Sequence, residues 1–219
     1  MNSRPRIALI SAVRAAIEPA EQAIARQFPS VDVWNILDDR LLEDARAKGG
    51  VDPALKGRMR RLIDHAIAEG ADGVLLTCSL YGSVASGESR RVPVLAPDEA
   101  SFADVAAGGF ESVLVVATLD SALTDSTARL TEFLRQAGSA TRVVGLLADE
   151  ALGASRTGDH HAMLETLSEA CRDRTEGGVL LAQYSLALAA EELATRLGKP
   201  VLSGPRSAAA KMFEATSGL

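Results

Sequence analysis

The chain has 219 residues, of which 47% are hydrophobic and 24% are charged, and its formal net charge is −6. This length is enough to bury a core, in one large domain or in two small ones, and the composition is that of an ordinary globular protein. The acidic balance, without any run rich in lysine and arginine, argues against a nucleic-acid partner.

Cysteine content and apolar runs bear on the compartment. The two cysteines, Cys78 and Cys171, do not make a disulfide framework, so nothing indicates an oxidising environment. The apolar run from Ile7 to Val13 is interrupted by Arg14, and no run approaches the roughly 20 residues that a membrane span needs. We therefore expect a soluble cytoplasmic protein with no membrane partner.

Short apolar runs alternate with longer helical patterns along the whole chain. The runs show little polar alternation, which is typical of strands covered on both faces of a parallel sheet. The expected strands are residues 7–11, 31–36, 73–77, 92–95, 113–117, 142–147, 179–182 and 200–202. The expected helices are residues 19–27, 55–69, 126–136, 162–175 and 207–215. This alternation predicts an α/β fold of doubly wound type.

The two halves of the chain repeat each other. "GVLL" begins at Gly73 and again at Gly178, "PVL" at residues 93 and 200, and "IALISAVRAA" from Ile7 lies over "VLVVATLDSA" from Val113. The repeat predicts two similar domains, each with a four-stranded parallel sheet, related by pseudo-two-fold symmetry around a cleft. We place them at residues 1–98 with 205–219 and at 99–204, with the closing helix packed on the first domain.

Polar residues follow the predicted strands in both halves. Ligands of open parallel sheets bind beyond the carboxyl ends of the strands. The residues at these corners are rich in hydroxyls and lie at helix starts, which suits a small anion, above all a carboxylate. They are Ser11, Thr77, Cys78, Ser79 and Asp98 in the first half, and Thr118, Gln183, Tyr184 and Ser185 in the second.

Cys78 is the candidate catalytic residue. A thiol at a helix N-terminus has a lowered pKa, so Cys78 can serve as general base, general acid or nucleophile. The competing interpretation is a small buried apolar residue, and the strand-end position beside Thr77 and Ser79 favours catalysis. Cys171 lies inside a helical stretch and is expected to fill space.

Other polar residues have two interpretations or a structural one. Asp98 either binds substrate or caps the following helix, and Tyr184 either points into the cleft or closes the sheet edge. His160 and His161 follow Asp159, a good N-cap residue, and are expected on the surface. No glycine-rich phosphate loop, metal-ligand spacing or G-x-S-x-G elbow is present, so we expect chemistry without a cofactor or a metal.

Four segments together resemble the aspartate/glutamate/hydantoin racemase superfamily. They are "LLTCS", "VPVLAPDEA", "VLVVATLDSALT" and "VLLAQYSLA", and their order covers nearly the whole chain. The last is similar to a branch that carries an alanine-glutamine pair. The resemblance implies two cysteines, one per domain, that move a proton at the substrate α-carbon without pyridoxal phosphate. It also implies that Cys78 is the first thiol, Thr77 and Ser79 bind the carboxylate, and Ser11, Thr118 and Ser185 are further hydroxyl donors.

Gln183 departs from the pattern that the resemblance implies. It stands at the second thiol position, where a primary amide neither gives nor takes a proton. Tyr184, with an ordinary pKa near 10, is a poor substitute base.

The expected function is therefore that of a cofactor-independent racemase or isomerase acting on a small carboxylate or a hydantoin-type compound. The alternatives are a one-thiol decarboxylase of an activated malonate-type acid, a cis–trans isomerase with a nucleophilic cysteine, and a non-catalytic binder of small anions. Residues 40–52 and 149–159 are expected to be specificity loops. The sequence does not fix the oligomeric state, although enzymes of this size with a cleft commonly self-associate and a homo-oligomer is possible.

Overall fold

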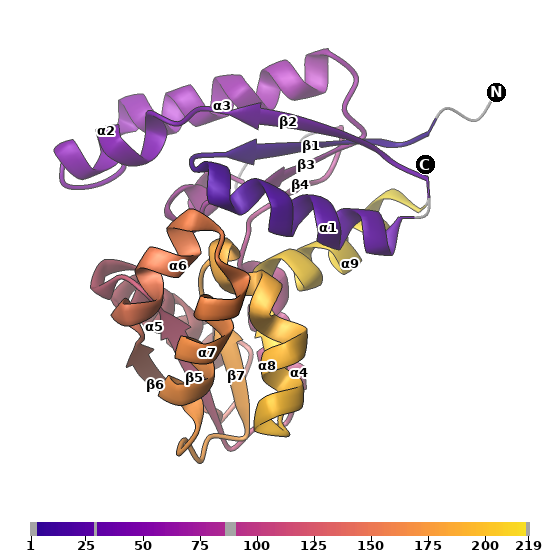
Figure 1. Cartoon of the computed structure of the whole chain (residues 1–219). Coiled ribbons are helices and arrows are strands. Elements are labelled where there is room, and N and C mark those ends of the chain that lie inside the picture. The colour runs from indigo at the N-terminus through magenta and orange to yellow at the C-terminus, as the bar shows by residue number, and fades with distance from the viewer. Residues whose placement is uncertain (1–3, 29, 86–90, 218–219) are drawn as a thin grey trace. The chain divides into compact units, whose positions relative to one another are not determined.

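The computed structural model describes residues 4–28, 30–85 and 91–217 (Figure 1). The chain divides into two compact units. The first comprises Met1–Glu99 together with Ala208–Leu219, and the second comprises Ala100–Ser207. The sequence places these divisions after residues 98 and 204.

The first unit contains a parallel sheet in the order β2-β1-β3-β4. Strands β1 and β3 lie in its centre, and their apolar residues from Ile7 to Ile10 and from Val74 to Leu76 are fully buried. The elements are β1 (Arg6–Ser11), η1 (Arg14–Ala16), α1 (Ile17–Gln27), β2 (Asp32–Leu37), α2 (Leu41–Ala47), α3 (Pro53–Ala68), β3 (Gly73–Leu76), η2 (Ser79–Val84), β4 (Val94–Leu95) and the closing helix α9 (Gly204–Thr216).

The second unit repeats this topology with the order β6-β5-β7-β8, again parallel throughout. The predicted fold class, with two similar α/β domains built on parallel four-stranded sheets, is confirmed. The elements are α4 (Glu99–Ala107), β5 (Ser112–Ala117), α5 (Asp120–Gln136), β6 (Arg142–Leu147), η3 (Asp149–Ala151), α6 (Leu152–Thr157), α7 (His160–Cys171), β7 (Gly178–Leu181), η4 (Tyr184–Ala189), α8 (Ala190–Leu197) and β8 (Val201–Ser203).

Capping residues fix where several helices begin or end. The Asp52 carboxylate accepts the Leu55 N–H at 2.8 Å and precedes Pro53, which suits the first helical turn of α3. The Asp159 carboxylate accepts the Ala162 N–H at 3.0 Å at the start of α7. At the ends of α6 and α8, Gly158 and Gly198 adopt φ values of 74° and 62°, which glycine tolerates.

Two segments that we predicted as loops are helical. Residues 40–52 contain α2, and residues 149–159 contain η3 and α6. Each of these helices has seven residues or fewer. Such lengths span too few turns for an apolar period to show in the sequence. The α2 helix is held instead by burying Leu41 and Ala45 in the core of the first unit.

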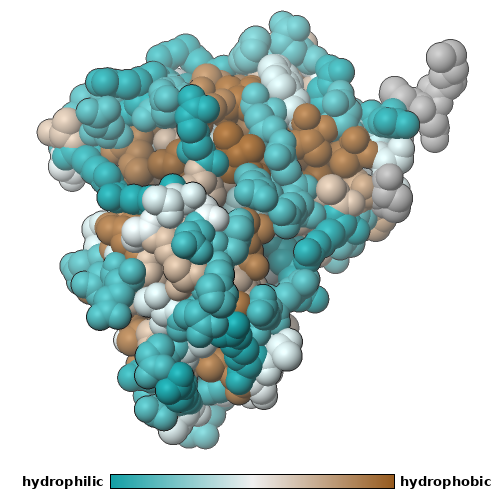
Figure 2. Space-filling model, viewed as in Figure 1, coloured by the Kyte–Doolittle hydropathy of each residue, from teal (hydrophilic) through white to brown (hydrophobic). Residues whose placement is uncertain are grey.

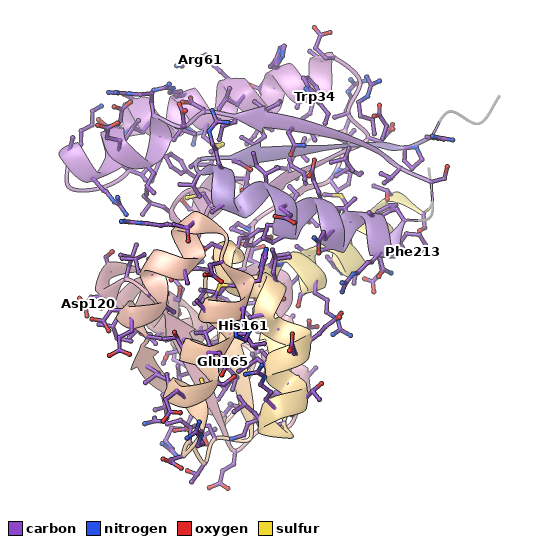
Figure 3. The ribbon with its side chains drawn as sticks, in the orientation of Figure 1. Trp34, Arg61, Asp120, His161, Glu165 and Phe213 are labelled. Carbon is purple, nitrogen blue, oxygen red and sulfur yellow. The ribbon has the colours of Figure 1, made fainter. Side chains whose placement is uncertain are left out.

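The closing helix α9 packs on the first unit. Its Phe213, labelled in Figure 3, meets Phe28 edge to face, with ring centroids 5.1 Å apart. Met212 is fully buried and lies against Gly73, at the start of β3. A Cβ atom added to Gly73 would stand 2.5 Å from Met212 Sδ and 3.1 Å from Ile7 Cδ1. The absence of a side chain at residue 73 therefore makes room for α9.

The edge strand β2 is covered less completely than the central strands. Its residues from Val33 to Leu37 are half-buried, whereas β3 is buried throughout. Figure 2 shows apolar surface on the first unit in the region where Figure 1 draws β2. In the part of the chain that the structure describes, no helix is long and apolar enough to span a bilayer.

We predict that Gly73→Ala destabilises the protein by about 1–3 kcal/mol, because the new methyl group overpacks the contact with the buried Met212 and Ile7. Gly57→Ala in α3 is the control. Its new Cβ would meet only Arg61 Nη1, at 3.6 Å, and the change is expected to stabilise the helix by up to about 1 kcal/mol. Urea unfolding of both variants measures the difference, and equal stability of the two would contradict the packing argument.

Candidate functional site

The strand order of each sheet marks one corner as the ligand-binding edge. In the first unit the chain leaves β1 toward β2 on one side and β3 toward β4 on the other. The carboxyl ends of β1 and β3 are therefore a topological switch point, where open α/β sheets bind ligands. The same holds for β5 and β7 in the second unit. We call the residues that follow β1 and β3 the first corner, and those that follow β5 and β7 the second corner.

Ser11 and Thr77 meet at the first corner. The Thr77 hydroxyl donates to Ser11 Oγ at 2.9 Å, and the Thr77 N–H donates to the Ile10 carbonyl at 3.1 Å. Both side chains belong to buried residues, 1% and 4% exposed. The structure thus brings these two predicted residues together, with the Thr77 hydroxyl proton directed to Ser11.

Ser79 and Asp98 form a second pair at the first corner. The Ser79 hydroxyl donates to Asp98 Oδ1 at 2.9 Å, and Asp98 is buried. Asp98 directly precedes α4, so it occupies the N-cap position of that helix. Its carboxylate holds Ser79, the half-buried residue that follows Cys78 in the chain.

Cys78 lies at the turn between β3 and η2. Its backbone is extended, with φ −120° and ψ 113°, and its carbonyl accepts the Tyr81 N–H at 3.1 Å. The residue is half-buried and packs partly against the core of the first unit. The helix that follows is a six-residue 3₁₀ helix, not the α-helix that a lowered thiol pKa presupposes. A short helix has few aligned peptide dipoles, so position at a strand end is the firmer argument for Cys78.

Gln183 occupies the matching position at the second corner. Its backbone is extended, with φ −129° and ψ 137°, and the 3₁₀ helix η4 follows it. Gln183 Oε1 accepts the Thr118 N–H at 2.6 Å and the Thr118 hydroxyl at 3.0 Å. Two donors on one atom identify that atom as the amide oxygen. The two hydrogen bonds to Oε1 therefore fix the orientation of the carboxamide. Its other group, the Nε2 amino group, is a hydrogen-bond donor.

The other two predicted residues of the second corner differ in exposure. Tyr184 begins η4 and is buried, 5% exposed, at the position that Ser79 holds in the first repeat. Ser185 is half-buried on the same short helix. Thr118, which holds Gln183, is also buried. Gln183 and Ser185 are consequently the two residues of this corner with the more accessible polar side chains.

The remaining thiol and the histidines of α7 lie outside both corners. Cys171 is fully buried, and burial raises the pKa of its thiol to about 11. His160 and His161 are exposed on α7, as expected, and His161 lies near Glu165 on that helix (Figure 3). Among the described residues, no group of three or more His, Cys, Asp or Glu side chains is arranged to hold a metal ion.

Three residues near the carboxyl ends of the strands escaped the sequence analysis. Tyr81 is fully buried three residues after Cys78, and its hydroxyl donates to the Leu41 carbonyl at 2.8 Å. A comparison of the two repeats could have found it, because the position that matches Tyr81 in the second repeat is occupied by Leu186. Leu80 and Leu147 are 39% and 38% exposed, and each follows or ends a strand at the carboxyl edge. Exposed leucines carry no periodic signal in a sequence, so only the fold could reveal them.

No family model matches the chain, and no curated protein matches it in sequence. Solved structures do match it over nearly its whole length. The aspartate racemase of Picrophilus torridus is 15% identical, with a TM-score of 0.72, and the match covers 97% of this chain and 94% of that one. The allantoin racemase of Klebsiella pneumoniae is 20% identical, with a TM-score of 0.69 and coverages of 98% and 88%.

An enzyme of another reaction class matches as well. Unliganded arylmalonate decarboxylase is 20% identical, with a TM-score of 0.60, and the match covers 98% of this chain and 93% of that one. At these identities the likeness concerns the backbone and not the side chains. The chain has the two-domain α/β fold that aspartate and allantoin racemases share with arylmalonate decarboxylase.

Proposed function

We propose that this protein is a racemase- or isomerase-like enzyme that acts on a small carboxylate or a hydantoin-type compound without a cofactor, and that the Cys78 thiol transfers the proton. One observation carries the proposal. The fold builds the same strand-to-3₁₀ corner twice, with a half-buried thiol in one copy and a carboxamide fixed by Thr118 in the other. The fold of the racemases and of the decarboxylase supports the reaction class.

The chemistry at the first corner begins with the thiolate of Cys78. The thiolate takes the proton from the carbon next to the substrate carbonyl or carboxylate, and the electron pair left on that carbon moves onto oxygen. The developing oxyanion needs hydrogen-bond donors. The thiol then returns a proton to carbon, so that no atoms are gained or lost.

The second corner presents a hydrogen-bond donor at the position where the first corner has its thiol. Because Gln183 Oε1 is held by both donors of Thr118, its amino group is free to bind a carboxylate or enolate oxygen. The Ser185 hydroxyl is a further donor there. The second corner has a carboxamide at the position that Cys78 holds in the first corner, so it offers no thiol for proton transfer.

Decarboxylation of an activated malonate-type acid is the second candidate, and the state of Gln183 favours it. Loss of carbon dioxide leaves an electron pair on carbon, and a single acid suffices to protonate it. The Cys78 thiol would give that proton and would recover one from water. Leu80, which is 39% exposed two residues after Cys78, suits a substrate with an apolar substituent, which makes an aryl-substituted malonate a sensible probe.

We predict that Cys78→Ala lowers turnover by at least about a hundredfold, the low end of what a general acid or base contributes, and leaves the unfolding midpoint nearly unchanged. Cys171→Ala is the matched control and should keep its activity, because that thiol is buried and protonated at neutral pH. Steady-state kinetics with aspartate, allantoin and phenylmalonate measure the loss. Full turnover in the Cys78→Ala protein would rule out the assigned role.

Alkylation separates an enzyme from a non-catalytic binder. Iodoacetamide at pH 7 should modify Cys78 and spare Cys171, since the buried thiol has a pKa of about 11. An acid that is a substrate should slow the modification of Cys78. A protein that binds such acids and never turns one over, with Cys78 inert to the reagent, would be the small-anion binder instead.

The two reactions differ in what leaves the substrate. Incubation in deuterium oxide should place deuterium at the α-carbon of a racemase substrate without release of carbon dioxide. A decarboxylase should release one carbon dioxide per turnover and place a single deuteron on the product. Proton NMR together with a carbon dioxide assay distinguishes them, and the absence of both with every probe would contradict the proposed reaction class.

Two substitutions of Gln183 test its role as a donor. Gln183→Leu is expected to cost about 1–3 kcal/mol of stability, because the buried Thr118 N–H and hydroxyl lose their acceptor. Gln183→Glu keeps an acceptor oxygen for Thr118, so stability should be largely retained, whereas affinity for a carboxylate should fall at least about tenfold through loss of the donor and charge repulsion. Thermal unfolding and ligand titration check the two effects. Unchanged affinity in the glutamate variant would remove Gln183 from the binding site.

A further inference from the structure

We propose that Tyr81 is a positioning residue for the Cys78 thiol, and that it acts by tying the turn that carries Cys78 to helix α2. The inference rests on the proposed function only in so far as the thiol of Cys78 is the reactive group. The contacts themselves lie within the first unit.

Tyr81 holds the Cys78 turn at two points. Its N–H donates to the Cys78 carbonyl at 3.1 Å, which closes the first turn of η2. Its hydroxyl donates to the Leu41 carbonyl at 2.8 Å, across 40 residues of sequence. The side chain is 0% exposed, so water cannot take the place of either partner. Cys78 and the first residue of α2 are thus joined through one residue, Tyr81, which bonds to Cys78 by its backbone N–H and to Leu41 by its phenol.

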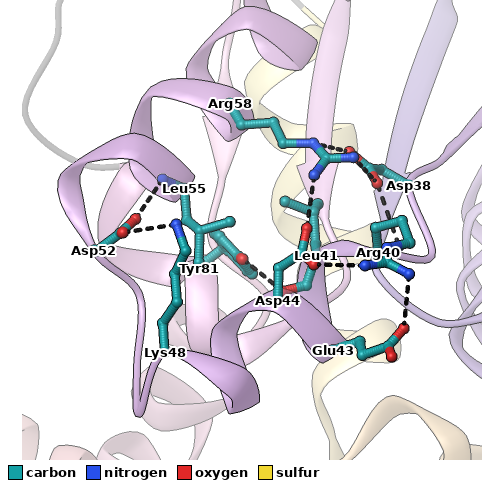
Figure 4. A network of polar contacts seen from close by, with 10 residues as sticks. All are labelled: Asp38, Arg40, Leu41, Glu43, Asp44, Lys48, Asp52, Leu55, Arg58 and Tyr81. Carbon is teal, nitrogen blue, oxygen red and sulfur yellow. Dashed lines mark hydrogen bonds and ion pairs between the residues drawn. The ribbon is translucent and has the colours of Figure 1, made fainter.

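Helix α2 is in turn anchored by Arg58 on α3 (Figure 4). Arg58 contacts both carboxylate oxygens of Asp38, with Nε–Oδ2 and Nη2–Oδ1 distances of 2.6 and 2.7 Å. Its Nη1 contacts Asp44 Oδ2 at 3.0 Å. Asp38 lies just before α2 and Asp44 lies within it. The guanidinium therefore binds one carboxylate that precedes Leu41 in the chain and one that follows it. The Leu41 carbonyl, which accepts the hydrogen bond from the Tyr81 hydroxyl, therefore lies in a segment that Arg58 holds on both sides.

The second unit shows that the fold itself does not require this tie. Leu186 stands at the position of Tyr81, because its N–H donates to the Gln183 carbonyl at 3.1 Å, and it is equally buried. Ala148 stands at the position of Asp38, since the two N–H groups donate to the matching carbonyls of Ala117 and Ser11. An apolar residue thus suffices at both places. The hydrogen bond from the Tyr81 hydroxyl to Leu41 is found in the half that carries Cys78.

The electrostatics agree with a permanent donor. Burial, followed by the neighbouring Cys78, raises the pKa of Tyr81 to about 12, and Arg58 opposes the rise while Asp38 and Asp44 add to it. The phenol is therefore protonated throughout the pH range in which thiols titrate. The hydrogen bond from the Tyr81 hydroxyl to the Leu41 carbonyl therefore persists near neutral pH.

Removing the tie should free the turn. A 3₁₀ helix has poorer hydrogen-bond geometry than an α-helix, so η2 depends on its tertiary contacts. Without the bond to Leu41, residues 78–81 should sample orientations that expose the thiol to water. Exposure would make the thiol easier to alkylate and at the same time would misplace it for proton transfer. Reactivity toward reagents and turnover are thus expected to change in opposite directions.

The test uses Tyr81→Phe, which removes only the hydroxyl. The matched control is Thr216→Val, which removes another buried hydroxyl donor from the first unit, the one that bonds to Met212 at 2.8 Å, far from Cys78 in sequence. The second-order rate of Cys78 alkylation by iodoacetamide is measured by peptide mass spectrometry between pH 6.5 and 9.5. We expect a rate at least about three times that of the wild type for Tyr81→Phe, with a shifted pH profile. The control should match the wild type.

Asp44→Asn provides a second, independent variant. It weakens the anchor of α2 without touching the phenol or the thiol, and the alkylation rate should rise in the same direction by about twofold. If Tyr81→Phe does not fold, this variant decides the question. A rate and a pH profile equal to the wild type in the folded variants would overturn the inference, even where Cys78→Ala is inactive. Conversely, a faster rate beside a fully active Cys78→Ala protein would leave the positioning intact and remove the proposed function.

Where turnover is found, a kinetic split provides the last readout. Tyr81→Phe should lower kcat by about tenfold and leave KM within about twofold, because the misplaced thiol affects the proton transfer more than the binding of the acid. An equal loss in the Thr216→Val control would mean that general destabilisation is the cause. That result would also overturn the inference.

Discussion

The structure depends on the pairing of the first and third strands of each sheet. The Thr77 N–H bonds to the Ile10 carbonyl and the Ala182 N–H bonds to the Val116 carbonyl, so the last residues of β1 and β3, and of β5 and β7, are brought to one edge. Neighbouring strands in a parallel sheet run in the same direction, and every carboxyl end lies at that edge. The reversal of strand order between them leaves the corner open for ligands. Small hydroxyls, a thiol and a carboxamide reach the candidate sites through this backbone register.

The two corners show which features of a duplicated fold are required for folding and which residues are candidates for another role. Both copies bury the same GVLL strand and follow it with a 3₁₀ helix of six residues, so these features belong to the fold. The side chains differ at several matching places, among them Cys78 against Gln183, Tyr81 against Leu186, and Asp38 against Ala148. In each pair the second copy stays folded with the alternative residue. The residues of the first copy are therefore candidates for a role beyond stability, and they are linked through Tyr81 and α2.

Gln183 bears most directly on the reaction. A carboxamide that bridges to Thr118 through its oxygen neither accepts nor releases a proton, but it does present a donor. Under the proposed function, this corner would suit a reaction that needs one acid and would not suit one that needs two thiols. The structural likeness to racemases and to a decarboxylase spans both kinds of chemistry. Under the proposed function, the choice between them rests on the substrate, and the exposed Leu80 near Cys78 favours a substrate with an apolar part.

The sequence by itself determined the parallel sheets, the duplication and the corner residues, because buried strands and their repeated order leave a strong local signal. It missed the short helices α2 and α6, whose few turns show no period, and it could not assign which hydroxyls face inward. Only the tertiary structure decided that Thr118 locks Gln183 and that Tyr81 reaches Leu41. Those bonds join residues 65 and 40 positions apart, and nothing in a local pattern encodes such distances. Side-chain orientation is set by packing, which the sequence specifies only through the completed fold.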